Sequence, residues 1–290
     1  MFAFNHTCTI NPKIPWMQAA SPPLDFSIRL ETEDFAVIEK PPGLLVHPTK
    51  PNSEPTLLEG LKALFCYEET IGGIVTPIHR LDRETSGLLL VAKNHHAASS
   101  LSQAMQNGLI QKNYLALCFG WPTEHRWEVE GPILKASSVG QSKVWLRRTL
   151  HPNGKPAHTF FTTIACFQIE MEKFSLILAT PTTGRTHQIR IHLAKSNLPI
   201  VGDKVYARGE EWFLHFLEKG LTNDLLNSLK LPRHALHSFR LTFEHKGIHY
   251  DVISELPTDW LPLVDLNSLP SYLLPKPLTS HFCPSPNAKN

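Results

Sequence analysis

The chain has 290 residues, of which 42% are hydrophobic, and a formal net charge of +2. This length and composition predict one folded domain of the α/β or α+β class with a substantial core. No stretch approaches the roughly 18 apolar residues of a membrane span, and the N-terminus lacks the basic start and apolar core of a signal peptide. We therefore expect a cytoplasmic protein that is neither secreted nor embedded in a membrane.

Charge is distributed unevenly along the chain. Nine basic and two acidic residues lie between Gly131 and Gly202, a net charge of +7, so the rest of the chain, whose total is +2, must carry −5. A localised basic region on an otherwise acidic protein is typical of a surface that binds a polyanion. The same cations could instead be spread around a solvated sheet, and charge alone does not decide between the two interpretations.

The cysteines are odd in number, widely spaced and without a C-x-x-C pair. This pattern favours buried free thiols in a reducing compartment over disulfides, zinc binding or redox chemistry. The five are Cys8, Cys66, Cys118, Cys166 and Cys283.

The first predicted elements follow the composition of short segments. Residues 35–40 have strand composition, the Pro-Pro-Gly of 41–43 interrupts them, and a strand is expected to resume at 44–46. Leucines at helical spacing predict a helix over 54–65. A second helix is predicted over 96–106, ended by Asn-Gly.

The middle of the chain, from Gln111 to Phe174, is predicted to be rich in β-structure. Asn153-Gly154 marks a tight turn between two of its strands, and a helix is expected over 187–195. The clearest predicted strands are 114–119, 143–146, 159–164 and 174–179.

The last third is predicted to contain a helical region over 210–229 and a hairpin of 239–244 with 248–253. Seven prolines occur in the final 35 residues, so the chain beyond Leu266 is expected to wrap the domain or to be disordered. The predicted organisation is an extended or disordered arm (1–24), one domain (25–266) and a proline-rich tail (267–290).

The segment His79–Gly87, HRLDRETSG, places one carboxylate between two guanidiniums. An uncharged strand-like run follows it, so Asp82 is expected where a loop enters the sheet, held by a rigid scaffold. Nearby arginine favours the ionised carboxylate, which suits a nucleophile or a stabiliser of positive charge better than a proton donor. An isolated motif of this kind could also be a capping aspartate, or one paired with Arg80.

Five segments occur in a specific order and spacing. They are Glu39–Pro48, His79–Lys93, Gln111–Tyr114, Gly184–Asp203 and Ala235–His237. Together they resemble the RluA-type family of RNA pseudouridine synthases, over about residues 28–255. The resemblance implies an α+β fold, with a mixed, largely antiparallel central sheet, flanking helices and an RNA-binding catalytic cleft.

The resemblance also implies isomerisation of selected uridines in ribosomal or transfer RNA to pseudouridine, with no metal and no redox cofactor. The base is detached from C1′ through N1, rotated, and reattached through C5. Asp82 matches the family's catalytic aspartate. An ionised carboxylate can stabilise or trap the positive character that develops at C1′. Attack on C1′ and removal of a ribose proton to give a glycal both stay open.

Two more residues are implied to be catalytic: Arg190, which would hold Asp82 ionised, and Tyr114, which would stack on the base. Arg80 could instead form an ion pair with Asp82 or Glu84. Residues expected to contact RNA are Arg80, Arg185, His187, Gln188, Lys40 and Lys112, the role of Lys40 being partly architectural.

Two alternatives come from other functional classes. A non-catalytic RNA-binding protein would keep the cleft without the chemistry. A metal-dependent hydrolase would use the histidines, but His187 and His192 are five apart rather than four, so structural histidines are favoured.

Substrate choice is expected to rest on the catalytic domain itself. Only about 24 residues precede the predicted domain, which leaves no room for the small N-terminal RNA-binding domain of some relatives. The loops at 135–155 and 207–233 are the expected determinants. We expect RNA as the partner and a monomeric protein.

Overall fold

The computed structural model describes residues 25–48 and 54–274. Our expectations for the arm of residues 1–24 and for the tail beyond residue 274 lie outside the described residues. Within them, no helix is long and apolar enough to cross a membrane.

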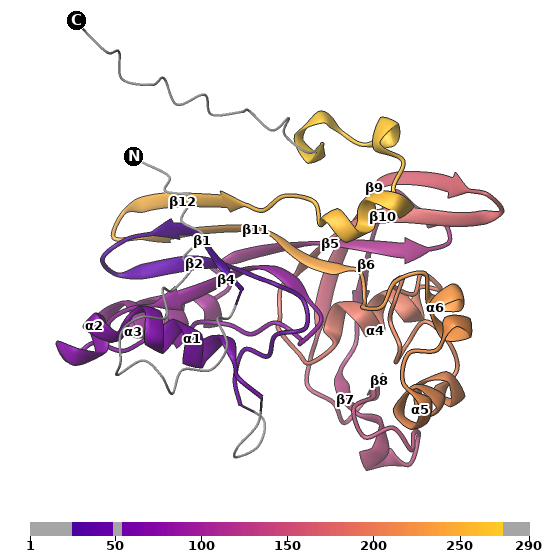
Figure 1. Cartoon of the computed structure of the whole chain (residues 1–290), viewed down its shortest axis with the longest axis horizontal. Helices are drawn as coiled ribbons and strands as arrows, with labels where there is room; N and C mark the ends of the chain where they lie inside the picture. The colour runs from indigo at the N-terminus through magenta and orange to yellow at the C-terminus, as the bar shows by residue number, and fades with distance from the viewer. Residues whose placement is uncertain (1–24, 49–53, 275–290) are drawn as a thin grey trace, which may run out of the picture.

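In the described part of the chain, ten strands form one sheet that spans the molecule (Figure 1). Its order is β1-β2-β4-β11-β5-β10-β9-β6, with β12 beside β11 and β3 beside β4. The pair β4 and β11 is parallel and the other described pairs are antiparallel, which confirms the mixed, largely antiparallel α+β fold. The strands are β1 (Ser27–Glu31), β2 (Phe35–Lys40), β3 (Thr76–Pro77), β4 (Ser86–Ala92), β5 (Gln111–Phe119), β6 (Arg126–Glu130), β9 (His158–Ile169), β10 (Glu172–Pro181), β11 (Leu236–His245) and β12 (Ile248–Ile253). A separate two-stranded sheet pairs β7 (Ile133–Lys135) with β8 (Arg148–Leu150).

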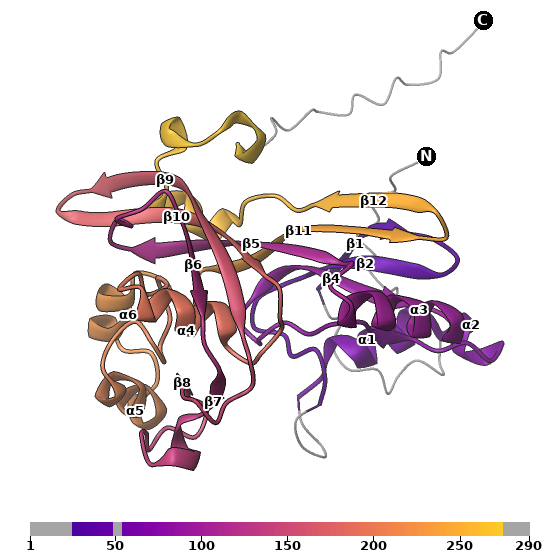
Figure 2. The same cartoon turned by 180° about the vertical axis from the view of Figure 1, so that it is seen from behind.

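The helices form two groups at opposite ends of the sheet, as both views show (Figures 1 and 2). One group is α1 (Leu57–Leu64), α2 (Cys66–Thr70) and α3 (His95–Gln106), and the other is α4 (Gln188–Lys195), α5 (Glu210–Lys219) and α6 (Asn223–Leu229). Strands β2 and β4 are covered on both faces, because alternate residues of each belong to two different apolar clusters, one shared with α1 and the other with α3. Double burial explains why these strands are continuously hydrophobic in sequence.

Local sequence signals set several element boundaries. Helix α1 begins after Thr56, whose hydroxyl accepts from the Glu59 amide while the Glu59 carboxylate accepts from the Thr56 amide. Helix α3 begins after Asn94, whose side-chain oxygen accepts from the Ala97 amide, one residue before the predicted start. The predicted helical region 210–229 is divided at Gly220, where α5 ends with positive φ.

Two predicted strands are wrong. Residues 44–46 do not join the sheet, because the Leu45 and Val46 carbonyls accept hydrogen bonds from the first amides of α1. Residues 143–146 form a turn, because the amides of Lys143 and Val144 donate to the Glu210 carboxylate at 2.7 and 3.0 Å. In both segments, partners distant in sequence satisfy the backbone without a neighbouring strand.

The described chain continues past the predicted domain end at Leu266. Two short 3₁₀ helices, η4 (Leu266–Ser268) and η5 (Ser271–Leu273), follow it, and Leu269 and Leu273 are buried in the main apolar cluster. The first residues assigned to the tail therefore pack on the domain.

Three cysteines lie in the described residues, and all are free thiols. Cys118 is buried as predicted, but Cys66 and Cys166 are exposed, so our expectation of burial is wrong for these two. Cys8 and Cys283 lie outside the described residues.

The parallel junction of β4 and β11 generates our first prediction. Gly87 has φ +101°, and a Cβ there would lie 2.3 Å from the Ser238 carbonyl oxygen, an atom of the backbone. We expect Gly87→Ala to lower the free energy of unfolding by about 3 kcal/mol, combining left-handed strain with a backbone clash. Urea denaturation measures the change. Gly72, with φ +85° and no neighbour within 4 Å, is the matched control, and Gly72→Ala should cost about 1 kcal/mol. Equal losses in the two variants would contradict the proposed clash.

Candidate active site

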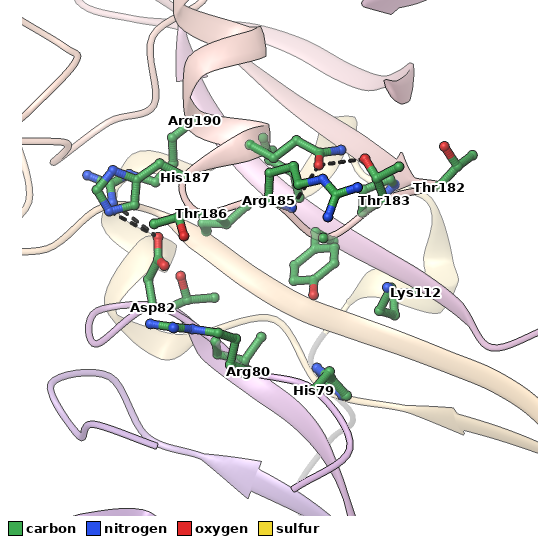
Figure 3. Close-up of a pocket in the computed structure, with 18 of the residues that line it drawn as sticks. His79, Arg80, Asp82, Lys112, Thr182, Thr183, Arg185, Thr186, His187 and Arg190 are labelled. Carbon is green, nitrogen blue, oxygen red and sulfur yellow. Dashed lines mark hydrogen bonds and ion pairs between the residues drawn. The ribbon is translucent and has the colours of Figure 1, made fainter. Parts of the chain in front are cut away.

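A cavity of about 520 Å³ lies between the loop before β4 and the start of α4. Eight of the nine residues predicted as catalytic or RNA-binding line it, and Lys40 does not. In Figure 3, Asp82 points toward His187 and Arg190, while His79 and Lys112 lie on another side of the cavity. The eight are Arg80, Asp82, Lys112, Tyr114, Arg185, His187, Gln188 and Arg190.

Asp82 lies in the loop between β3 and β4. Its carbonyl oxygen accepts from the Thr85 amide at 3.1 Å, and the neighbouring Arg83 carbonyl accepts from the Gly43 amide at 2.9 Å. The Arg83 side chain binds Glu54 and the Gly43 carbonyl, and so points away from Asp82. These bonds fix the loop as a turn attached to the segment after β2, so the Asp82 carboxylate has a defined position.

Glu84 anchors the other side of this loop. Its carboxylate accepts from Lys204 Nζ at 2.6 Å and from the His234 amide at 3.1 Å. Burial opposes ionisation of Glu84, but the hydrogen bond and charge of His234, together with Lys204, hold its pKa well below the usual range. The sequence analysis did not single out Glu84 for this role, because both partners are more than 100 residues away.

Lys40 is structural, which corrects its prediction as an RNA contact. Its side chain is fully buried and its ammonium donates to the carbonyl oxygens of Pro41, Leu44 and Arg83 at 2.7, 2.9 and 3.0 Å. Burial lowers the pKa of Lys40 to about 7. All three donors of the ammonium group are therefore used in shaping the chain beside the Asp82 loop.

Arg190, in the first turn of α4, joins two carboxylates. Its Nη1 donates to Asp82 Oδ2 at 3.1 Å, while Nε and Nη2 donate to the two oxygens of Asp203 at 2.7 and 2.8 Å. Asp203 Oδ1 also accepts from the amides of Val205 and Tyr206. The pairing of Arg190 with Asp82 was predicted, but Asp203, inside one of the quoted motifs, was missed as the group that holds the guanidinium.

Electrostatics keep Asp82 ionised. Burial alone would raise its pKa, but attraction to His187, which is protonated at the acidic pH where Asp82 titrates, and to Arg190 lowers the pKa to about 2. Asp203 in turn raises the pKa of the buried Arg190 against its own desolvation. The carboxylate and the guanidinium are therefore both charged at neutral pH.

His187 lies beside Asp82 and is held by Tyr206. Its Nε2 is 3.9 Å from Asp82 Oδ2, and its Nδ1 is 3.0 Å from the Tyr206 hydroxyl, which accepts from the Arg148 amide at 2.8 Å. When the Tyr206 hydroxyl donates to Nδ1, the imidazole proton lies on Nε2, facing Asp82. Burial lowers the pKa of His187 to about 3, so the ring is neutral. His187 also has φ 58°, a strained conformation of the kind found at functional sites.

Tyr114 lies in β5, in the middle of the sheet, opposite Ala179 of β10 and Ser238 of β11. Only 7% of the residue is exposed, yet it lines the cavity. Burial raises the pKa of its phenol, so the ring is uncharged at neutral pH. An aromatic face in this position can contact a planar base.

Three further cations surround the cavity. Arg80 is exposed and forms no ion pair with the described residues. Asp82 and Glu84, the two carboxylates that it could have paired with, bind other cations. The alternative that Arg80 forms a structural ion pair is therefore not supported. Lys112 Nζ is 3.3 Å from the Met105 sulfur, a weak acceptor, and Arg185 Nε donates to the Pro156 carbonyl at 3.0 Å.

Gln188 supports the site from inside the protein. It is 3% exposed, and its amide accepts from the Thr183 hydroxyl and the Arg185 amide and donates to the His158 carbonyl and the Thr159 hydroxyl. These bonds tie the turn before α4 to β9. Gln188 therefore has a structural role, and its contact with RNA stays a prediction.

Metal binding finds no support in residues 25–48 and 54–274. No group of three or more His, Cys, Asp or Glu side chains there could hold a metal ion. The hydrolase alternative therefore has no candidate centre within these ranges.

Comparison with known proteins points to one family. A family model described as RNA pseudouridylate synthase matches residues 34–195. An uncharacterized RNA pseudouridine synthase of Helicobacter pylori is 32% identical over 234 residues, which cover 81% of this chain and 74% of the relative. Ribosomal large subunit pseudouridine synthase D of Yersinia pestis is 36% identical over 253 residues, which cover 84% and 70% respectively.

Solved structures show the same similarity. Human RNA pseudouridylate synthase domain containing 1 aligns with a TM-score of 0.63 and 26% identity, over 89% of this chain and 93% of the human chain. Human RNA pseudouridylate synthase domain containing 4 aligns with a TM-score of 0.61 and 22% identity, over 81% and 90%, which supports the fold.

Buried neutral histidines, two of which line the cavity, predict sensitivity to acid. Burial lowers the pKa values of His79, His187 and His237 to about 3 each. Below pH 6.5 the unfolded chain therefore binds protons that the folded chain does not, so stability falls as pH decreases from 6.5 toward 4. Each such histidine contributes about 1.4 kcal/mol per pH unit.

Urea denaturation between pH 5 and 7 measures this slope. The variant His79→Gln keeps an acceptor for the Leu90 amide. Its free energy of unfolding should depend less steeply on pH than that of the wild type, by up to about 1.4 kcal/mol per pH unit, which corresponds to one proton. His249→Gln, at an exposed position, is the control. An unchanged slope in the His79 variant would contradict a neutral His79 in the folded protein.

Proposed function

Because this chain belongs to the RluA-type family of RNA pseudouridine synthases, which isomerise uridine in RNA to pseudouridine, we propose that Asp82 performs the chemistry at C1′ of the target ribose. The chain is an isomerase that acts on RNA. The observation that carries the assignment of Asp82 is its position: it is an ionised carboxylate in the cavity, bonded to Arg190 through one oxygen only. Its other oxygen, Oδ1, accepts no hydrogen bond from the described residues and is available to the ribose.

The charge balance of the site supports stabilisation of a cationic ribose. Asp82 and Asp203 share the single charge of Arg190, so the three groups carry a net charge of −1 beside the cavity. Positive character that develops at C1′ would be attracted to this cluster. A carboxylate with a pKa of about 2 is a weak base, which favours attack on C1′ or stabilisation of its charge over removal of a ribose proton.

The other cavity residues are assigned to holding the nucleotide. Tyr114 would stack on the detached base while it turns, since an aromatic face binds any orientation of a planar ring. Arg80, Lys112 and Arg185 would meet phosphates, because the cavity presents them as cations with few or weak acceptors of their own. His187 would direct its Nε2 proton toward the Asp82 carboxylate and so keep it in place.

We propose ribosomal RNA of the large subunit as the substrate. The support is the similarity to relatives named for that RNA, several of which match 70% or more of their length. We further propose a cytoplasmic monomer whose catalytic unit extends from residue 25 to at least residue 274, with substrate choice depending on the loops at 135–155 and 207–233.

Pseudouridine mapping of total RNA tests both the function and the role of Asp82. Cells that lack the protein should lose pseudouridine at one or more positions of large-subunit RNA, and expression of the wild-type chain should restore it. The Asp82→Asn variant should restore none, and its rate on that RNA in vitro should fall by at least about a thousandfold. The variant loses its attraction to Arg190, so its melting temperature should fall modestly, and circular dichroism at the assay temperature should show that it remains folded.

Two outcomes would count against these assignments. Loss of modification only in transfer RNA would overturn the substrate proposal and leave the enzyme class intact. Measurable turnover by purified Asp82→Asn, beyond contamination, would overturn the role of Asp82.

Asp203 is expected to act as a positioning residue through Arg190. The variant Asp203→Ala would remove the two hydrogen bonds that hold the Arg190 guanidinium, so Arg190 would no longer fix the position of Asp82. The single-turnover rate should fall about 10- to 100-fold, with RNA affinity changed less than about twofold. The chain provides a matched control in Asp259, which binds Arg233 through the same two-bond geometry at 2.7 and 2.8 Å, away from this cavity. Asp259→Ala should lower thermal stability but leave the rate nearly unchanged. Similar rate losses in both variants would mean that Asp203 acts only through stability.

A further inference from the structure

The chain between β6 and β9, residues 131–157, forms a small unit of its own, which we call the β7–β8 element. It consists of β7, the 3₁₀ helix η2 (Ala136–Val139), a turn and β8. We propose that this element binds RNA that flanks the target uridine, and that Trp145 is a platform on which an unpaired base of that RNA stacks. The proposal rests on the function proposed above and names a second contact region for the same substrate.

Trp145 is exposed in a way that packing does not explain. The residue is 62% exposed, whereas its neighbour Val144 is 2% exposed and belongs to an apolar cluster. The described contact of the indole is with Lys135, whose ammonium nitrogen lies 5.9 Å from the ring centroid. Proteins bind single-stranded nucleic acid with exposed aromatic rings, on which bases stack, and with nearby cations, which contact phosphates. Trp145 and Lys135 provide this combination.

The backbone that presents Trp145 is well anchored. Glu210 Oε1 accepts from the Ser142 hydroxyl at 3.1 Å and from the amides of Lys143 and Val144 at 2.7 and 3.0 Å. Val144 is buried with Ile133 and Tyr206. The indole is therefore directed outward by a fixed turn, so binding a base would cost little additional ordering.

The positive charge of the β7–β8 element favours a polyanion as its ligand. Between Gly131 and Ala157 there are five basic residues and no acidic residue. A segment with this composition attracts phosphates, and it has no carboxylate of its own to offer a basic protein partner. The five are Lys135, Lys143, Arg147, Arg148 and Lys155.

The element is joined directly to the wall of the active-site cavity. The Arg148 amide at the start of β8 donates to the Tyr206 hydroxyl, which bonds His187 beside Asp82. At its other end, the Pro156 carbonyl accepts from Arg185, a cavity-lining residue. Figures 1 and 2 show β7 and β8 close to α4, the helix that carries Arg190. RNA that enters the cavity can therefore continue onto this element.

Substitution of Trp145 tests the proposal in the full-length protein. The probes are a fluorescein-labelled 20-nucleotide single-stranded RNA, measured by anisotropy, and a large-subunit ribosomal RNA transcript, measured by KM and kcat. Loss of one stacked base in Trp145→Ala should weaken binding and raise KM about tenfold, with kcat changed less than twofold. Trp145→Phe should recover most of the affinity, because it keeps an aromatic face.

Trp121 is a matched control within the same chain. It is 43% exposed, lies after β5, and has Lys173 Nζ 4.4 Å from its ring centroid. Trp121→Ala should leave binding of both probes unchanged.

Three outcomes would overturn the proposal: unchanged affinity in Trp145→Ala, an equal loss in Trp121→Ala, or no recovery in Trp145→Phe. A change in the mass of the protein in solution on substituting Trp145, without a change in RNA affinity, would instead assign the indole to contact with a second copy. If the wild type binds the 20-nucleotide RNA but does not modify the ribosomal transcript, the proposed substrate fails, while the oligonucleotide still decides the role of Trp145.

Discussion

The guanidinium of Arg190, shared between Asp82 and Asp203, is the interaction on which the site depends. A buried arginine is tolerated only where its donors are satisfied, and here three of its nitrogens bond carboxylate oxygens. Asp203 is in turn fixed by two backbone amides. The direction of Nη1, and with it the position of Asp82, is therefore set by rigid backbone on the side of α4.

The sheet supplies the other half of this constraint. The Asp82 loop leads into β4, which pairs in parallel with β11 at Ser86 and Gly87, and Gly87 permits the close approach to Ser238. Glu84 ties the same loop to Lys204, the residue after Asp203. The Asp82 loop is thus bonded both to Arg190 and to the residue after Asp203, which limits the motion of the Asp82 carboxylate against its partner.

Sequence patterns predicted the helices and strands that depend on residues close together in the chain. The composition of 35–40 predicted both ends of β2 correctly, and the Asn-Gly pair after residue 106 predicted the end of α3, whose start is one residue earlier than expected. The approach of Asp82 to Arg190, 108 residues away, came from the family resemblance, because no periodicity encodes it. Lys40 and Gln188 carry polar groups typical of RNA contacts, but sequence does not show that neighbouring carbonyls and one distant carbonyl bind Lys40, or that hydroxyls and backbone groups bind Gln188.

Satisfaction of polar groups separates scaffold from contact surface in this protein. Lys40, Gln188 and Asp203 have every strong donor or acceptor used internally, so a nucleotide would have to break existing bonds to reach them. Within the described residues, Asp82 Oδ1 and the Arg80 guanidinium have no such partner, and the Lys112 ammonium has only a sulfur. These groups lie around one cavity, to whose wall the β7–β8 element is joined through Arg148 and Pro156. Because a ligand can supply the partners that these groups lack, the distribution of unsatisfied groups supports the proposed RNA contacts more strongly than residue type alone does.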